Sequence, residues 1–287
     1  MKSPHAESAT APDGTAGPEA ALEAAGTPDF ALRRISEKAF PGVEVPLLHH
    51  PEWAREYPWL VQGITHRGDP DGADFDLGIG GRAPVADVLG RWERVRQALG
   101  MRGVVISRQV HGATVRLARA PLVGVHLTLP ADGHLTADPD LLLAVSVADC
   151  VPVFLVEPRS RTLALLHAGW RGVAAGVVEE GVRSLQDRFG VEPSSLLAHL
   201  GPAISGARYP VGPEVPVALD LPDPGSTIHL DLTPHIAERL VRQGVTPEAI
   251  TASSYCVHDH PAFFSHRGGD GGRQMALLGF RGRPGER

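Results

Sequence analysis

The sequence has few of the residues that mark extracellular, membrane-spanning or nucleic-acid-binding proteins. Only two cysteines occur in 287 residues, which excludes a disulfide-rich scaffold, and we expect Cys150 and Cys256 to be free or metal-bound. No apolar run reaches the roughly 20 residues that a membrane helix needs. The net charge is −6 and the pI about 6.1, so we expect neither a nucleic acid nor a membrane as a partner.

Local nucleotide-binding patterns are also missing. There is no G-x-G-x-x-G after a predicted strand and no Walker loop, so a dinucleotide-binding or NTP-binding fold has no local support. The first ten residues, MKSPHAESAT, contain no apolar signal core, and we expect a cytoplasmic protein. Hydrophobic residues (43%) and charged residues (21%) occur in the proportions of ordinary globular proteins.

The chain divides into an N-terminal tail and a globular part. Residues 1–40 are rich in alanine, glycine and proline, and up to about Arg34 they include almost no large apolar side chains. Such a segment cannot bury enough surface to offset the entropy of ordering. We predict a disordered tail over residues 1–40 and a single α/β domain over residues 41–287. Apolar periodicity predicts helices at 85–99, 173–189 and around 236–241, and strands at 61–65, 104–107, 115–117, 196–200, 250–255 and 275–280.

A predicted hairpin carries the candidate metal site. Val151–Glu157 and Thr162–His167 are expected to form two antiparallel strands, which places Cys150 at the entrance of the first and His167 at the exit of the second. Those two ends are neighbours in space, and His111 follows another predicted strand. Two imidazoles and one thiolate match zinc, and three protein ligands leave a fourth position open, as in a catalytic site.

Five short motifs resemble those of a known family. They are Q-V-H-G at 109–112, A-D-C-V-P at 148–152, H-A-G-W-R-G at 167–172, G-P-A-I at 201–204 and F-F-S-H-R at 263–267. The resemblance is to the laccase-domain family, whose YfiH-like members are also called multicopper polyphenol oxidases and zinc-dependent purine nucleoside phosphorylases. The motifs keep the family's order from about Val61 to Phe280.

The resemblance implies a fold, an activity and a metal. The fold would be a single layered α/β/β/α domain similar to cysteine-hydrolase toxins. The activity would be phosphorolysis of adenosine, inosine and methylthioadenosine to the free base and a pentose 1-phosphate, accompanied by adenosine deamination. Purine nucleosides and phosphate would be the small-molecule partners. The implied zinc ligands are His111, Cys150 and His167, which form the catalytic set together with Asp149.

Phosphate and purine require further side chains. Phosphate must be held below the anomeric carbon, a task suited to guanidinium groups and helix N-termini. Arg171 lies in a glycine-flanked turn, and Arg267 and Arg273 flank a glycine-rich loop, so we predict that these three bind phosphate. For the nucleoside we predict contacts from Gln109 and from three aromatic residues that can stack on a purine, Trp170, Phe263 and Phe264.

The sequence departs from the family pattern at several positions. Relatives usually carry Asn where Asp76 stands, Glu where Pro210 stands and a second arginine where Gly268 stands. The C-T-Y that usually precedes F-F-S is here C-V-H at 256–258. We expect these changes to affect contacts to the nucleoside and not the metal ligands. The cysteine and histidines around 256–260 are interpreted as loop residues and not as a second metal cluster.

Three other functions are alternatives to purine nucleoside phosphorolysis. The set of two histidines and one cysteine is also the core of a blue-copper oxidase site, but copper there expects an axial methionine, and the chain has only three methionines. Cys150 activated by His167 would suit an amide hydrolase, in line with the peptidoglycan editing known in some relatives. A nucleotide-binding module with a structural zinc would need four closed ligands, whereas the sequence offers three.

Overall fold

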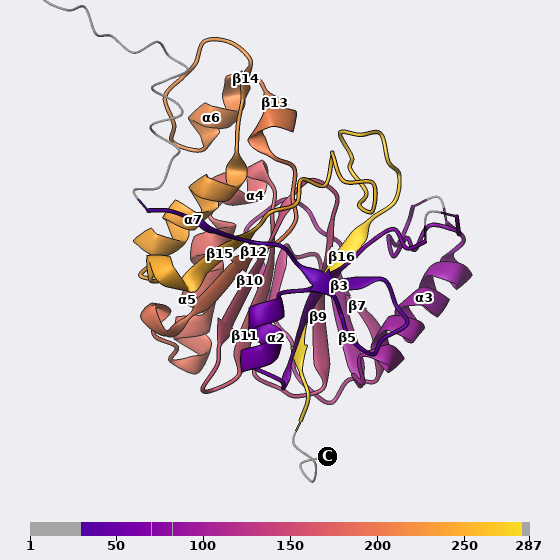
Figure 1. The fold of residues 1–287 in the computed structure, drawn as a ribbon. Helices are drawn as coiled ribbons and strands as arrows, with labels where there is room; N and C mark the ends of the chain where they lie inside the picture. The colour runs from indigo at the N-terminus through magenta and orange to yellow at the C-terminus, as the bar shows by residue number, and fades with distance from the viewer. Residues whose placement is uncertain (1–29, 70, 82, 283–287) are drawn as a thin grey trace, which may run out of the picture.

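Two β-sheets pack face to face, and helices cover their outer faces (Figure 1). The computed structural model describes residues 30–69, 71–81 and 83–282. Figure 1 shows α5 (Val177–Phe189) and α7 (Leu232–Arg242) on the outer side of one sheet and α3 (Val85–Ala98) on the outer side of the other. This is the α/β/β/α layering that the resemblance implied, so the predicted fold class is confirmed.

The first sheet contains the predicted hairpin. Strands β10 (Val151–Glu157) and β11 (Thr162–Ala168) pair in antiparallel fashion, with Pro152 opposite His167. The hairpin is therefore confirmed, with one residue added at its end. Across the sheet the strand order is β1 (Arg33–Ile35), β15 (Ile250–Ser253), β12 (Leu197–Leu200), β10, β11, β8 (Gly133–Thr136) and β6 (Val115–Leu117).

The second sheet carries the remaining long strands. Its order is β2 (Lys38–Ala39), β3 (Leu47–His49), β4 (Leu60–Thr65), β16 (Gln274–Phe280), β9 (Leu141–Val147), β5 (Gly103–Ser107) and β7 (Gly124–Thr128). A separate small pair consists of β13 (Pro210–Val211) and β14 (Ile228–His229). Because β9 belongs to the second sheet and β10 to the first, residues 148–150 link the two sheets.

The helix predicted over residues 173–189 is two helices. Gly176 has a φ of +88°, in the left-handed region that a continuous right-handed helix does not contain. The chain therefore forms α4 (Trp170–Ala174) before this glycine and α5 after it. The other short helices are α2 (Pro51–Glu56), α6 (Glu214–Ala218) and 3₁₀ turns at 193–195, 206–208 and 247–249. No helix in the described part of the chain has the length and apolar character that crossing a bilayer requires.

The central strands are apolar on both faces because each face is covered. Successive side chains of a strand point to opposite sides. In β10, Val153 and Leu155 pack against the helices of the first sheet, whereas Phe154 and Val156 pack between the sheets. A third apolar layer, which includes Trp92 of α3, lies outside the second sheet. This burial on both faces explains the near-continuous hydrophobic runs in the sequence.

The predicted tail extends too far along the chain. Residues 1–29 lie outside the described residues, but β1 pairs in parallel with β15, and β2 pairs with β3. Ile35 is only 6% exposed. Between the two strands, the buried Glu37 carboxylate accepts a hydrogen bond from Ser253 at 2.8 Å. The prediction of disorder is thus wrong for these strands, because backbone pairing and a few buried contacts order a segment of weakly apolar composition.

Acid is expected to destabilise the fold through a buried histidine. Burial, assisted by Arg116, lowers the pKa of His134 in β8 to about 4. Its ordinary pKa in the unfolded chain is about 6.5, so between these values the unfolded chain binds a proton that the folded chain does not. The free energy of unfolding should therefore fall as pH falls, by about 2 kcal/mol for this group at pH 5.

Urea unfolding of the metal-free protein at pH 7.5 and pH 5 measures this loss. Between these two pH values, the free energy of unfolding of His134→Gln should fall by about 2 kcal/mol less than that of the parent chain. The matched control is His229→Gln, because His229 is exposed, and it should behave like the parent. Equal losses in all three proteins would contradict the assignment to His134.

Candidate active site

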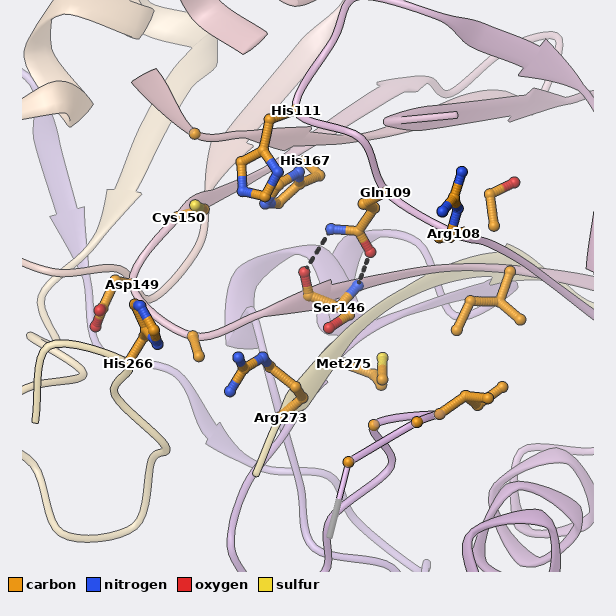
Figure 2. Close-up of a pocket in the computed structure, with 18 of the residues that line it drawn as sticks. Arg108, Gln109, His111, Ser146, Asp149, Cys150, His167, His266, Arg273 and Met275 are labelled. Carbon is orange, nitrogen blue, oxygen red and sulfur yellow. Dashed lines mark hydrogen bonds between the residues drawn. The ribbon is translucent and has the colours of Figure 1, made fainter. Parts of the chain in front are cut away.

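Three side chains that could ligate a metal ion meet where the two sheets are linked. Cys150 ends the connection between β9 and β10, His167 lies in β11, and His111 follows β5. Their ligand atoms all lie within 4.8 Å of one another. The two imidazole rings are 4.9 Å apart and nearly perpendicular, at 80°. The structure thus brings together the three residues that the sequence singled out, as Figure 2 shows.

The buried Asp132 positions two of the ligands. It is fully buried, and its Oδ1 lies 3.0 Å from Nδ1 of His167. Its two carboxylate oxygens also accept the backbone N–H groups of Val110, His111 and Gly112 at 3.2, 2.9 and 2.8 Å. These bonds hold the loop in which His111 has a φ of +57°. Such outer carboxylates orient metal-ligating histidines and fix their tautomer.

The charges of the ligands favour a deprotonated sulfur. Burial alone would raise the pKa of Cys150, but the positive charge of His167 and hydrogen bonds from both histidines outweigh it and lower the pKa to about 6. Burial opposes the protonation of His167, whereas Cys150 and Asp132 favour it and raise its pKa to about 9. The metal-free site at neutral pH therefore holds a thiolate beside an imidazolium, and the thiolate is the form that binds metals.

The donor set fits a metal ion. An ionised carboxylate only accepts hydrogen bonds, so Nδ1 of His167 carries the hydrogen and Nε2 is left for a metal. Ligand atoms about 2.0–2.3 Å from a tetrahedral zinc lie roughly 3.3–3.8 Å apart, a separation compatible with donor atoms within 4.8 Å of one another. Among the described residues, the segment 256–260 forms no comparable group, and Sγ of Cys256 accepts the N–H of Ser205 at 3.4 Å. The group can therefore bind a metal ion.

Asp149, predicted to be catalytic, holds a loop. Its Oδ1 accepts the hydroxyl of Ser265 at 2.6 Å, and its Oδ2 accepts the backbone N–H of Arg267 at 2.7 Å. The residue is 7% exposed and has a φ of +95°, a left-handed conformation that is strained for an aspartate. Because both oxygens are engaged, we assign Asp149 to positioning the loop that carries Arg267.

The three predicted phosphate-binding arginines line one pocket. Its volume is about 850 Å³, and it also contains the three metal-ligating residues. The Arg171 guanidinium lies 4.3 Å from the ring centre of Trp170, and that of Arg267 lies 5.0 Å from the ring centre of Tyr209. Arg273 donates to the carbonyl of Gly272 at 2.7 Å. Trp170 and Gln109 line the same pocket, so five of the predicted contact residues reach it.

Two predicted substrate contacts do not reach the pocket. Phe263 and Phe264 are 2% and 1% exposed and are absent from its lining. Phe263 packs in the core between the sheets, and Phe264 lies under the guanidinium of Arg67 at 4.4 Å. Stacking of these rings on a substrate is therefore not expected, because neighbouring residues already cover both of them.

Gln109 is held in place by the main chain of β9. Its Nε2 amide donates to the carbonyl of Ser146 at 2.7 Å, and its Oε1 accepts the N–H of Ser146 at 2.7 Å (Figure 2). Three other polar lining residues, Arg108, Tyr209 and His266, were not predicted from the sequence. Arg108 and His266 each adjoin a predicted residue in a family motif, which is the signal that could have found them.

Two of the departures from the family pattern bond to residues that line the pocket. Oδ1 of Asp76 accepts the backbone N–H groups of Gly78 and Arg273 at 2.8 and 2.9 Å, so this carboxylate connects the glycine loop at 78–81 to the β16 side of the pocket. The carbonyl of Pro210 accepts a hydrogen bond from the Arg267 guanidinium at 3.1 Å. Both residues therefore shape the pocket wall through the main chain.

Adding a methyl group at Gly169 is expected to displace the metal ligands. A Cβ there would lie 2.8 Å from Sγ of Cys150 and 3.3 Å from Cδ2 of His111. We expect Gly169→Ala to weaken metal binding by at least about 10-fold, since even outer-shell changes at metal sites cost 10- to 100-fold. Metal retained after dialysis against a competing chelator measures the effect.

The control for this variant is Gly90→Ala in α3. A Cβ at Gly90 meets no atom within 4 Å, and alanine is favoured over glycine inside a helix. This control should keep its metal and unfold at an equal or higher urea concentration. Full metal retention in Gly169→Ala would contradict the predicted crowding.

Comparisons with known proteins agree with the fold and with the family resemblance. The family described as multi-copper polyphenol oxidoreductase laccase matches residues 67–281. The chain is 32% identical over 255 residues to the purine nucleoside phosphorylase YlmD of Geobacillus stearothermophilus, covering 79% of this chain and 93% of that protein. The crystal structure of YlmD from the same organism gives a TM-score of 0.75 at 28% identity, covering 87% of this chain and all of the other.

A second relative matches over a shorter stretch. The chain is 34% identical over 170 residues to the purine nucleoside phosphorylase YlmD of Bacillus subtilis, which is 54% of this chain and 61% of that protein. The match to the family covers most of the described chain and includes His111, Cys150 and His167. The chain therefore belongs to the multi-copper polyphenol oxidoreductase laccase family.

Proposed function

We propose that the protein is a zinc-dependent purine nucleoside phosphorylase that also deaminates adenosine. One observation carries the proposal: three side chains that can ligate a metal, His111, Cys150 and His167, share a pocket with Arg171 and Arg267. The relatives named purine nucleoside phosphorylase support the same reaction. Adenosine, inosine and methylthioadenosine are the proposed substrates, together with phosphate.

The surroundings of the ligands favour zinc over copper. A blue-copper site adds a weak axial methionine to its two histidines and one cysteine. Met275 lines the same pocket, but Figure 2 shows it well apart from Cys150. Three protein ligands with an open position are typical of catalytic zinc, which supplies Lewis acidity there.

Phosphorolysis requires phosphate to be held against the anomeric carbon. An oxygen of phosphate bonds to that carbon, the bond from the carbon to the purine nitrogen breaks, and the purine leaves with a proton. The guanidinium groups of Arg171 and Arg267 suit this task, because charge-assisted, bidentate bonds orient phosphate. Asp149 holds the backbone of Arg267 in place. The flat ring of Trp170 offers a stacking surface for the purine.

Deamination uses the same nucleoside with water in place of phosphate. Water adds at the amino-bearing carbon of adenine and ammonia leaves, so inosine forms and the glycosidic bond stays intact. No anion has to be held for this reaction. The arginines are therefore expected to matter for base release and not for deamination.

A thiol hydrolase is the second candidate. The pKa of Cys150 near 6 beside a cationic His167 favours a nucleophilic thiolate, which attacks amides in cysteine hydrolases and would suit a peptidoglycan precursor. The two candidates respond oppositely to metal removal. A chelator should abolish a zinc-dependent phosphorylase, whereas it should free the thiolate of a hydrolase.

Product analysis on adenosine tests the proposal. The purified full-length chain should contain close to one zinc per chain, and its products are resolved by chromatography with and without phosphate. Adenine and ribose 1-phosphate should form only with phosphate, inosine should form in both conditions, and a chelator should stop both. Absence of adenine in the presence of phosphate, or its release despite complete zinc removal, would refute the proposed function.

A further inference from the structure

The pocket carries more positive charge than one phosphate ion requires. Among the described residues, its lining includes four arginines, Arg108, Arg171, Arg267 and Arg273, against one carboxylate, Asp149. Both oxygens of that carboxylate are already engaged in hydrogen bonds. The whole chain, in contrast, has a net charge of −6. A phosphate group carries about −1.5 to −2 near neutral pH, so the surplus indicates a ligand with a second anionic group.

Arg108 lies at the opposite end of the pocket from the metal group. Figure 2 shows it beyond Gln109, whereas Cys150 and Asp149 lie on the other side. Gln109 stands between them as a fixed residue, because both ends of its amide are bonded to Ser146. Arg267 belongs to the Asp149 end, since its backbone donates to that carboxylate. Arg108 and Arg267 therefore face different parts of a ligand.

The Arg108 side chain is free to bind an anion. It is exposed and forms no hydrogen bond or ion pair with any residue that the structure describes. Each of the other three arginines has a partner: Arg171 packs on Trp170, Arg267 donates to a carbonyl, and Arg273 donates to another. An arginine without a partner in the wall of a pocket is available for a phosphate.

The wall next to Arg108 is apolar and suits the body of a nucleoside. Ile106 precedes it by two residues in β5 and pairs with Leu127 of β7, and both side chains line the pocket together with Ile79. An apolar wall that ends in a cation matches a sugar and base that end in a phosphate. The pocket volume of about 850 Å³ leaves room for such a ligand beside inorganic phosphate.

We propose that the pocket binds purine nucleoside 5′-monophosphates, with the 5′-phosphate on Arg108 and the glycosidic bond towards the metal group. This inference rests on the proposed function and widens its substrate class from nucleosides to nucleotides. Phosphorolysis of such a substrate forms a bond from the anomeric carbon to an oxygen of inorganic phosphate and breaks the bond to the purine. The products are the protonated base and ribose 1,5-bisphosphate, with no change in oxidation state.

Calorimetric titration of the zinc-loaded full-length chain tests the inference. Inosine 5′-monophosphate and inosine are titrated separately at fixed ionic strength without inorganic phosphate, because neither can be deaminated or phosphorolysed under these conditions. The nucleotide should bind the parent chain at least about 10-fold more tightly than inosine, because an arginine–phosphate contact is charge-assisted. Arg108→Ala should remove this advantage and leave inosine binding unchanged, and Arg108→Lys should restore part of it.

The matched control is Arg188→Ala, an exposed arginine in α5 outside the pocket lining, which should bind both ligands like the parent. The inference is overturned if the parent does not prefer the nucleotide. It is also overturned if the preference survives Arg108→Ala and disappears in Arg267→Ala, because the nucleotide phosphate would then occupy the site for inorganic phosphate. Failure of adenosine phosphorolysis refutes the proposed function separately, while nucleotide binding that depends on Arg108 would still support this second anion site.

Discussion

Replacing Cys150 by serine is expected to abolish phosphorolysis and deamination together. The thiolate supplies the charged ligand of the metal group, and its low pKa keeps it deprotonated at neutral pH. A serine hydroxyl stays protonated there and is a poor substitute for a thiolate. Metal affinity should fall by more than roughly 100-fold, the upper limit for losing an outer-shell partner. Mass-spectrometric metal analysis and turnover on adenosine measure the two effects on one preparation.

The chain provides its own control in the second cysteine. Cys256 lies outside this pocket and accepts a hydrogen bond from the N–H of Ser205, a role that a serine hydroxyl can fill. Cys256→Ser should therefore keep its zinc and both activities. Unchanged zinc in Cys150→Ser would remove Cys150 from the ligand set and overturn the metal site.

Replacing Arg267 by alanine is expected to separate the two reactions. The guanidinium is proposed to bind phosphate, and a charge-assisted contact is worth about 1.5–3 kcal/mol. Phosphorolysis should fall by roughly 10- to 150-fold, whereas deamination needs no phosphate and should persist. The backbone N–H that donates to Asp149 remains in the alanine variant, so the loop should keep its place. Gly268 adds no second cation at this turn, which sharpens the effect.

Initial rates of adenine and inosine formation, measured across a range of phosphate concentrations, distinguish the possible outcomes. The expected change is a higher KM for phosphate with inosine formation within about twofold of the parent, an interval well below the 10-fold that 1.4 kcal/mol produces. Arg208→Ala is the matched control, since Arg208 is exposed, pairs with Asp259 at 2.7 Å and lies outside the pocket lining. Equal loss of both reactions in Arg267→Ala would assign Arg267 a structural role.

Much of the layered fold follows from periodicity along the chain. The helix at 85–99 and the hairpin after Cys150 were predicted within one residue of their ends, because apolar positions at helical or strand spacing must face a core. The division at Gly176 was not predicted, since its neighbours keep helical spacing on both sides. The strand at 33–35 was missed because its stability comes from pairing with β15, more than 200 positions later.

The grouping of the three candidate metal ligands was predictable, whereas the residues that support them were not. His111, Cys150 and His167 have side chains of a recognisable chemical type at the ends of strands. The role of Asp132 depends on the loop at 110–112 approaching it in space, which no local sequence pattern indicates. The predicted contact of Phe263 with the nucleoside was wrong for a different reason. Adjacent aromatic residues suit either a purine site or a core, and only tertiary packing decides between the two.

The link between the sheets gives the inter-sheet core a second role. His111 follows a strand of one sheet, His167 belongs to the other, and Cys150 lies in the connection at 148–150. A displacement of about 1 Å between closely packed layers would therefore change the ligand distances. We therefore expect fewer side chains to be tolerated at Phe154 and its neighbours between the sheets than in the two apolar layers that face helices. Selection for catalysis in this fold then acts on the packing of residues that no substrate touches.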